Sequence, residues 1–245
     1  KQFITSGNPS NPEAITQGEM VFVGYGIVAP ELEHDDYQGL DVTNKIVVTL
    51  AGKPKSFPSE EGAHFGSTSE KKRHAVERGA IGYVSISTPT YEKVRPYQSL
   101  LNYLHTPSVR WLDSDGKPAN TFPQLNNTAY FSKEAAETLF ADAKLNLAQI
   151  YEMLEKDESP KGFDLNTSLI LESKSSYESI SSPNVVAVLE GSDPVLKNEF
   201  IVYSAHSDHI GFAKTVKKDK SSLNLHIEFP NSSNISKVFK EFELS

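Results

Sequence analysis

Two short apolar segments with a capped helix between them lie between residues 45 and 86. Residues 45–50 (KIVVTL) are rich in β-branched side chains, as buried strands are. Thr68 or Ser69 can cap a helix over 70–78, and a glycine follows it. A second apolar run, IGYVSI, spans 81–86. This order predicts a β-α-β unit, and with it an α/β fold of the α+β kind that contains a mixed sheet.

The other expected elements come from the same kinds of pattern. The runs at 184–189 and 200–205 are almost continuously apolar, which is typical of strands buried on both faces of a sheet. Helices are predicted over 133–141 and 147–155, strands over 20–28, 169–173 and 223–229, and irregular chain over 1–17 and 89–128.

Composition excludes several classes of protein. The formal net charge is −8, which argues against a nucleic-acid partner, because nucleic-acid recognition needs a basic face. No apolar run is long enough for a membrane span. Cysteine is absent, so disulfides and thiolate metal sites cannot form, and any metal must be held by His, Asp or Glu.

One local motif carries residues suited to metal chemistry. The sequence AHSDH begins at Ala205, at the end of an apolar strand. His206 could offer a ring nitrogen to zinc, and Asp208, on the same side of an extended chain, could orient that ring. A polar strand end with satisfied histidines explains the five residues equally well.

The surrounding sequence resembles a known family. Residues 184–194 (NVVAVLEGSDP) and 201–211 (IVYSAHSDHIG) resemble the start of the catalytic domain of dizinc aminopeptidases, of the leucyl aminopeptidase and glutamate carboxypeptidase type. Residues 21–30 (VFVGYGIVAP), with the segments DDY, DV and KIVV that follow, resemble the protease-associated domain inserted in many of these enzymes. Residues 75–82 (AVERGAIG) fit that domain's step from helix to strand.

The resemblance implies a zinc-dependent aminopeptidase acting on peptides, and a secreted or periplasmic location. It implies that His206 is a zinc ligand and that Asp208 orients it. In the family, two zinc ions activate a bridging water, and a carboxylate accepts its proton. The family also needs a bridging Asp, a Glu-Glu pair, a further acidic ligand and a second His.

These further ligands do not follow in the sequence. After about residue 219 the resemblance ends, and no Glu-Glu pair occurs. We therefore expect a truncated peptidase domain with an incomplete metal site, whose open sheet edges could support a dimer. The expected organisation is an N-terminal segment 1–17, a β-rich protease-associated domain 18–172 with flanking helices, a Ser-rich connector 173–183 and a truncated zinc-peptidase domain 184–245.

Other polar candidates have simpler explanations. His34-Asp35-Asp36 could bind a cation, but a loop with Asx turns explains it more simply. His74, beside Lys71, Lys72 and Arg73, suggests a solvated helix face. The remaining candidates by residue type are His64, His226, Glu228, Glu241 and Glu243, for which exposed strand, loop or helix positions are favoured.

Aromatic residues gather in the proline-rich stretch. They could contact peptide, although packing within the loop is favoured. These residues are Tyr91, Tyr97, Tyr103 and Trp111.

Two hypotheses follow. In the first, the chain is a fragment of a zinc aminopeptidase that carries its protease-associated domain. In the second, it is a non-catalytic protease-associated module that binds peptide or protein and has no complete metal site.

Overall fold

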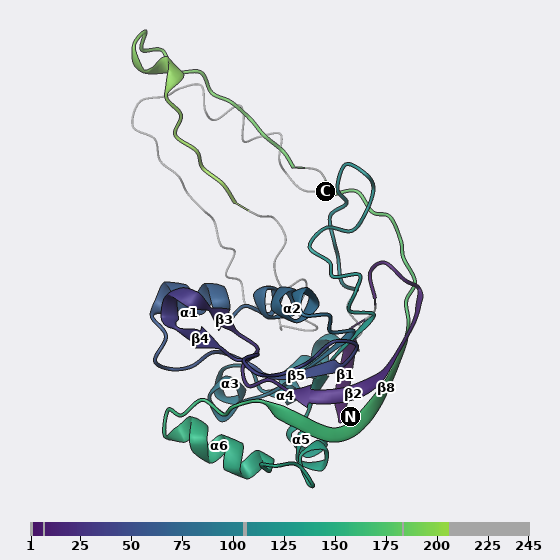
Figure 1. Ribbon diagram of the computed structural model, residues 1–245. Coiled ribbons are helices and arrows are strands. Elements are labelled where there is room, and N and C mark those ends of the chain that lie inside the picture. Colours follow the sequence, from purple (N-terminus) through teal and green to yellow (C-terminus); the bar gives the residue numbers. More distant parts are fainter. Residues whose placement is uncertain (1, 7, 105–106, 183, 206–245) are drawn as a thin grey trace, which may run out of the picture. The chain divides into compact units, whose positions relative to one another are not determined.

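The computed structural model describes residues 2–6, 8–104, 107–182 and 184–205 (Figure 1). The chain divides into two compact units, residues 1–181 and residues 182–245. In the described part, no helix is long and apolar enough to cross a membrane.

Unit 1 is built on a six-stranded mixed sheet in the order β1-β7-β6-β5-β2-β8. The four central strands run parallel, and the edge strands β1 and β8 pair antiparallel to their neighbours. A separate two-stranded ladder joins β3 and β4. The strands are β1 (Phe3–Ser6), β2 (Glu13–Phe22), β3 (Val28–Ala29), β4 (His34–Asp35), β5 (Ile46–Leu50), β6 (Gly82–Ile86), β7 (Asn127–Phe131) and β8 (Phe163–Lys174).

Helices flank the sheet, with α2 on one face and α5 and α6 on the other (Figure 1). The α-helices are α1 (Ser59–Phe65), α2 (Thr68–Glu77), α3 (Pro89–Val94), α4 (Tyr97–Leu100), α5 (Lys133–Leu139) and α6 (Leu147–Glu155). The described residues also form short 3-10 helices, η1 (Pro30–Leu32), η2 (Leu101–Tyr103) and η3 (Leu196–Asn198). The expected α/β fold with flanking helices is confirmed.

The predicted β-α-β unit is present, because β5 and β6 are parallel neighbours with α1 and α2 between them. Ser67 caps α2 by accepting a hydrogen bond from the Glu70 N–H, one residue before the expected cap. The predicted helices 133–141 and 147–155 are found as α5 and α6. Their caps are Ser132 and Asn146, each accepting a backbone N–H with its side chain.

The core lies on both faces of the sheet. Strand β5 is buried along its whole length, which explains its almost uniformly apolar sequence. Ile46, Val48 and Leu50 pack with the side that holds α5 and α6. Val47 packs on the side of α2 with the buried Tyr83 of β6.

Several expected boundaries are wrong. Residues 1–17, expected to be a loop, contain β1 and the first part of β2, and the strand expected at 20–28 ends at Phe22. The strand expected at 169–173 is the last part of the longer β8. The irregular stretch 89–128 includes α3, whose cap Thr88 accepts from the Tyr91 N–H, and α4. Where an element was missed or shortened, its sequence is mostly polar, whereas the strand expected at 20–28 was extended too far through an apolar run.

In the described part of unit 2, residues 184–189 and 200–205 are not strands, contrary to expectation. Their apolar side chains are exposed, Ile201 by 84% and Val186 by 84%. A strand needs a neighbour to receive its backbone hydrogen bonds, and no described segment pairs with either run. The apolar sequence of these runs favours burial, but among the described residues their side chains remain exposed.

A long two-stranded ribbon brings distant parts of the chain together. Strands β2 and β8 pair from Phe22 opposite Phe163 to Glu13 opposite Lys174, with a register shift between Glu19 and Val21. The residue just before β2 and the residue just after β8 are also adjacent, since the Ser175 N–H donates to the Pro12 carbonyl over 2.7 Å.

The buried amide of Asn127, at the start of β7, holds this ribbon. Its Nδ2 donates to Thr16 Oγ1 over 3.1 Å and to the Leu171 carbonyl over 3.0 Å. Its Oδ1 accepts from Ser173 Oγ over 2.7 Å. One side chain thus joins β7, β2 and β8.

Candidate functional site

The most unusual group of side chains lies beyond the carboxyl ends of the parallel strands β2 and β5. Open parallel sheets place ligands and reactive groups at such ends. The group consists of Tyr25, His34, Asp36 and Lys71, and we call it the Lys71 cluster.

Lys71 of α2 is the centre of this cluster and is only 2% exposed. Its Nζ donates to the Leu50 carbonyl over 2.9 Å and to the Gly52 carbonyl. It also lies 5.5 Å from the centroid of the Tyr25 ring, an arrangement that attracts a cation. Burial lowers the pKa of Lys71 to about 7, although the negative charge of Asp36 acts in the opposite direction.

Asp36 is fixed from two sides. Its Oδ2 accepts the Ile27 N–H over 2.9 Å, and its Oδ1 lies 2.9 Å from His34 Nε2. The adjacent Asp36 carboxylate raises the pKa of His34, so the pair is charged over a wider pH range than an isolated histidine would be. The expected Asx turn is confirmed at Asp35, whose Oδ1 accepts the Tyr37 N–H.

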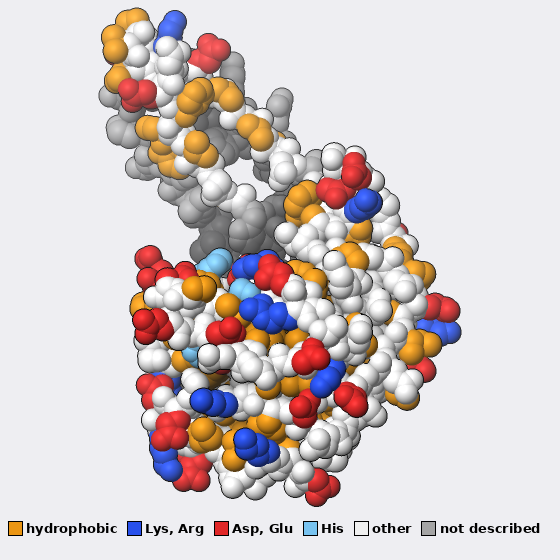
Figure 2. Space-filling view, in the orientation of Figure 1, with side chains coloured by type: hydrophobic (Ala, Val, Ile, Leu, Met, Phe, Trp, Pro, Cys, Tyr) orange, Lys and Arg blue, Asp and Glu red, His pale blue; other side chains and the backbone are white. Residues whose placement is uncertain are grey.

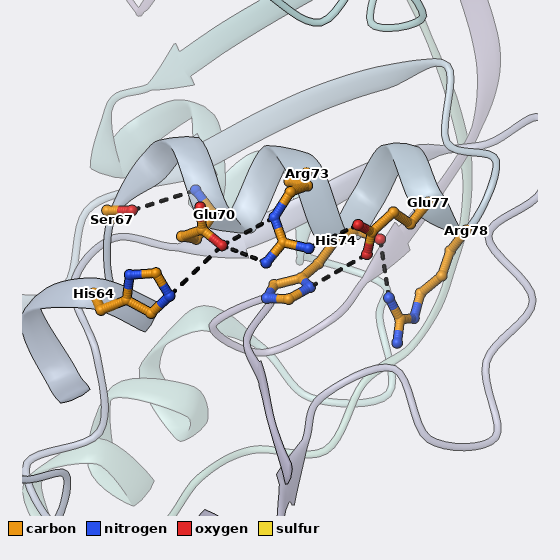
Figure 3. A network of polar contacts seen from close by, with 7 residues as sticks. All are labelled: His64, Ser67, Glu70, Arg73, His74, Glu77 and Arg78. Carbon is orange, nitrogen blue, oxygen red and sulfur yellow. Dashed lines mark hydrogen bonds and ion pairs between the residues drawn. The ribbon is translucent and has the colours of Figure 1, made fainter. Parts of the chain in front are cut away.

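A second polar group follows the exposed side of α2 (Figure 3). The Arg73 guanidinium contacts Glu70 and lies 2.7 Å from Glu77, while His64 of α1 lies 3.9 Å from Glu70. His74 Nδ1 lies 3.7 Å from Glu77. The two Arg73 pairs are at helical spacing and partly exposed, so each contributes only a few tenths of a kcal/mol, roughly 0.3–0.5.

The prediction that His74 lies on a solvated face is wrong. Its side chain is 7% exposed, and burial lowers its pKa, helped by the positive charge of Arg73. Its neighbour Lys71 is buried as well. The local run of charges concealed this, because the groups that cover these side chains are distant in sequence.

None of these groups forms a metal site. Within the described ranges, no three His, Asp or Glu side chains lie close enough to hold a metal ion together. His206 and Asp208, the predicted zinc ligand and its orienting acid, lie outside the described residues. So do His226, Glu228, Glu241 and Glu243. A zinc site in this chain would therefore need residues outside the described part.

Two shallow cavities lie away from the Lys71 cluster. One, of about 370 Å³, lies between α5 and β8 and is lined by residues that include Phe131, Leu139 and Leu165. The other, of about 240 Å³, lies between α5 and α6, where Tyr151 and three glutamates line it. Neither contains a residue that the sequence analysis proposes for catalysis.

The aromatic residues of the 89–128 stretch separate into two kinds. Tyr97 is buried and stacks on Tyr130 with ring centroids 5.9 Å apart, which confirms the packing role. Trp111 and Tyr103 are exposed by 64% and 67%, so packing within the loop does not account for them. On the face of unit 1 shown in Figure 2, acidic and basic side chains are interspersed among the coloured residues rather than gathered by sign.

Comparisons with known proteins give little further guidance. No family model and no curated protein matches the chain. The chain is similar to the solved structure of an aminopeptidase from Aneurinibacillus sp. strain AM-1, with a TM-score of 0.28 and 14% identity. The alignment covers 70% of this chain and 35% of that one, so the chain spans about a third of that protein's length. These values are too low to assign an activity.

Proposed function

We propose that the chain is part of a zinc-dependent aminopeptidase in which unit 1 is an accessory, non-catalytic domain of the protease-associated type. In this proposal His206 is a zinc ligand, Asp208 orients its ring, and the substrate is a peptide. The protein would act in the periplasm or outside the cell.

The observation that carries this proposal is the β2·β8 ribbon. Glu13 and Lys174 are 161 positions apart in the sequence and lie opposite one another, and the Tyr177 hydroxyl donates to the Asn8 carbonyl over 2.7 Å, so the segment that leaves unit 1 runs beside the segment that follows β1. Domains inserted into a host have neighbouring ends of this kind, because the host chain must continue from where it was interrupted. The resemblance of residues 21–30 and 201–211 to the two parts of such an enzyme supports the same arrangement.

A non-catalytic binding module is the second candidate. It is favoured by two large aromatic side chains of unit 1 that are exposed, Trp111 and Tyr103. In that case the exposed Trp111 and Tyr103 are the natural contacts for a peptide, since large aromatic side chains anchor interfaces.

Zinc content and peptidase activity separate the two candidates. The natural gene product and the 245-residue chain are purified side by side without chelators, and bound zinc is measured by elemental analysis. Hydrolysis of aminoacyl-p-nitroanilides is then measured with and without a chelator.

For the aminopeptidase, the natural product binds zinc and shows chelator-sensitive hydrolysis, and His206→Ala removes both. His209→Ala is the matched control and retains them. Asp208→Asn weakens zinc binding by roughly 10–100-fold, as the loss of a group that orients a ligand does. If the natural product ends at Ser245 and contains no zinc, the enzyme proposal is refuted and the binding module remains.

A further inference from the structure

A small hairpin over residues 109–119 of unit 1 forms its hydrogen bonds within itself, and we call it the Trp111 arm. Leu112 and Pro118 form an isolated antiparallel bridge between its two legs. Beside this bridge, the Ala119 N–H donates to the Trp111 carbonyl over 3.0 Å. The two legs are therefore held side by side as the legs of a β-hairpin are.

The turn of the arm is fixed mainly by one side chain. Asp113 Oδ1 accepts the N–H groups of Asp115 and Lys117, each over 2.9 Å. The backbone closes the same turn, because the Asp113 N–H donates to the Lys117 carbonyl over 2.9 Å. Bonds of this kind from an aspartate side chain to the backbone favour a tight turn. The arm therefore has a defined conformation without support from the core.

The first leg of the arm exposes three large apolar side chains within four positions. Val109, Trp111 and Leu112 are exposed by 63%, 64% and 54%. Single exposed apolar residues are ordinary on a protein surface, but a contiguous group on an ordered element marks a surface that binds something.

The charges of the arm cancel, so charge does not select the ligand. Arg110 and Lys117 carry two positive charges, and Asp113 and Asp115 carry two negative ones. An uncharged apolar ligand therefore suits the arm better than an acidic or a basic one.

The backbone of the first leg indicates the shape of the ligand. In an antiparallel ladder the N–H and C=O groups of successive residues point to alternate sides. Trp111 and Asp113 bond to the second leg, so the N–H and C=O of Leu112 point away from it. In the part of the chain that the structure describes, neither Arg110 nor Leu112 makes a backbone hydrogen bond. This leg therefore has an open edge that another extended chain can pair with.

We propose that the Trp111 arm binds an extended, uncharged peptide, which adds a third strand beside Leu112 and covers Val109 and Trp111. In this mode of recognition the main-chain hydrogen bonds supply affinity, and the side chains at alternate positions supply specificity. The ligand has apolar side chains at alternate positions. The inference rests on the second candidate function, to which it gives a site and a mode of binding.

A second copy of the chain fits this surface less well. Two arms that paired with one another would cover about four residues on each copy, whereas a stable interface uses roughly 20–30 residues a side. The formal net charge of −8 also makes two copies repel. A small contact surface suits a peptide that binds weakly and is released again.

The fluorescence of Trp111, the only tryptophan in the sequence, reports the binding directly. The probe is a peptide of alternating valine and threonine with a lysine at one end and a glutamate at the other. It is acetylated and amidated, so that it is not a substrate for an aminopeptidase. Titrated into the 245-residue chain, it should shift the emission to shorter wavelength in a saturable way, because it excludes water from the indole.

A modified peptide tests whether strand pairing is the mode of binding. The same peptide with N-methyl groups on its three central residues keeps every side chain but cannot pair along either edge. It should bind about 10-fold more weakly or worse, the effect of losing two hydrogen bonds.

Two valines provide matched variants of the protein. Val109→Ala should weaken binding by about 4-fold, the loss expected when half of the removed surface is covered by peptide. Val94→Ala, at an exposed position on α3, is the control and should bind as wild type does. Both side chains are exposed, by 63% and 76%, so both variants should fold.

The mode of binding is refuted if the N-methylated peptide binds as well as the unmodified one, or if both valine variants bind alike. If calorimetry detects binding while the Trp111 emission stays unchanged, the peptide binds elsewhere, and the arm is refuted although the second candidate function stands. Analytical ultracentrifugation at the same concentrations tests the alternative occupant, and a dimer that the peptide does not dissociate would overturn the proposal. Zinc content and hydrolysis are measured separately, so the aminopeptidase proposal can fail without this one.

Discussion

The amide of Asn127 makes a specific prediction about how the ribbon is held. Asn127→Ala removes two donated hydrogen bonds and one accepted one, and it leaves Thr16, Leu171 and Ser173 without these partners. Asn127 and Thr16 are 1% and 2% exposed, so water does not replace the lost bonds without rearrangement. At about 1 kcal/mol for each bond, the free energy of unfolding should fall by about 3 kcal/mol.

Urea unfolding followed by far-UV circular dichroism measures this change. Asn102→Ala, at an exposed position in η2, is the matched control and should change the stability by less than about 0.5 kcal/mol. Asn127→Asp keeps the acceptor for Ser173 but loses both donors, so it should be at least as harmful as alanine. Hydrogen exchange should show the loss concentrated in residues 13–17 and 170–174. A loss below about 1 kcal/mol for Asn127→Ala would refute the view that this amide joins the three strands.

Two further predictions concern the carboxyl end of the sheet. Gly26 has a φ of +71°, and a Cβ there would lie 2.7 Å from Thr49 Cγ2, so Gly26→Ala should destabilise unit 1 by about 2 kcal/mol or more. Gly39 has a similar φ of +78° but open space around it, so Gly39→Ala should destabilise unit 1 by only about 1 kcal/mol. Thermal unfolding of both variants measures the difference, and equal losses of stability would contradict the steric argument. Asp36 raises the pKa of His34, so the stability from this pair is fully present below pH 6.5 and is lost as the pH rises through the raised value. Asp36→Asn should therefore lower the free energy of unfolding more at pH 6 than at pH 8.5. A decrease that does not change with pH would show that Asp36 does not favour the protonated form of His34.

The elements that could be predicted from the sequence are those that depend on residues close to one another in the chain. Strand β5 follows from IVVTL, and the start of α5 follows from Ser132, because an apolar run and a capping side chain act within a few residues. The first half of β2 was missed for the opposite reason. Its sequence, EAITQGE, is mostly polar, and it becomes a strand by pairing with β8 about 150 residues later.

The same distinction explains the candidate site. His206 and Asp208 were found because they stand in one short motif, but they lie outside the described residues. Lys71 was taken for part of a solvated face, because lysines usually are. Its burial depends on Tyr25, Asp36 and the end of β5, none of which is near it in the sequence. The charged residues at positions 71, 72 and 78 have no sequence neighbours that would indicate that tyrosine rings from other parts of the chain cover them.

Two of the buried polar side chains that the sequence did not reveal act at opposite ends of the parallel strands. Asn127 begins β7 and holds the β2·β8 ribbon at the amino ends, whereas Lys71 binds the carbonyls at the carboxyl end of β5. An amide does not titrate, so the contacts of Asn127 with the ribbon should be insensitive to pH near neutrality.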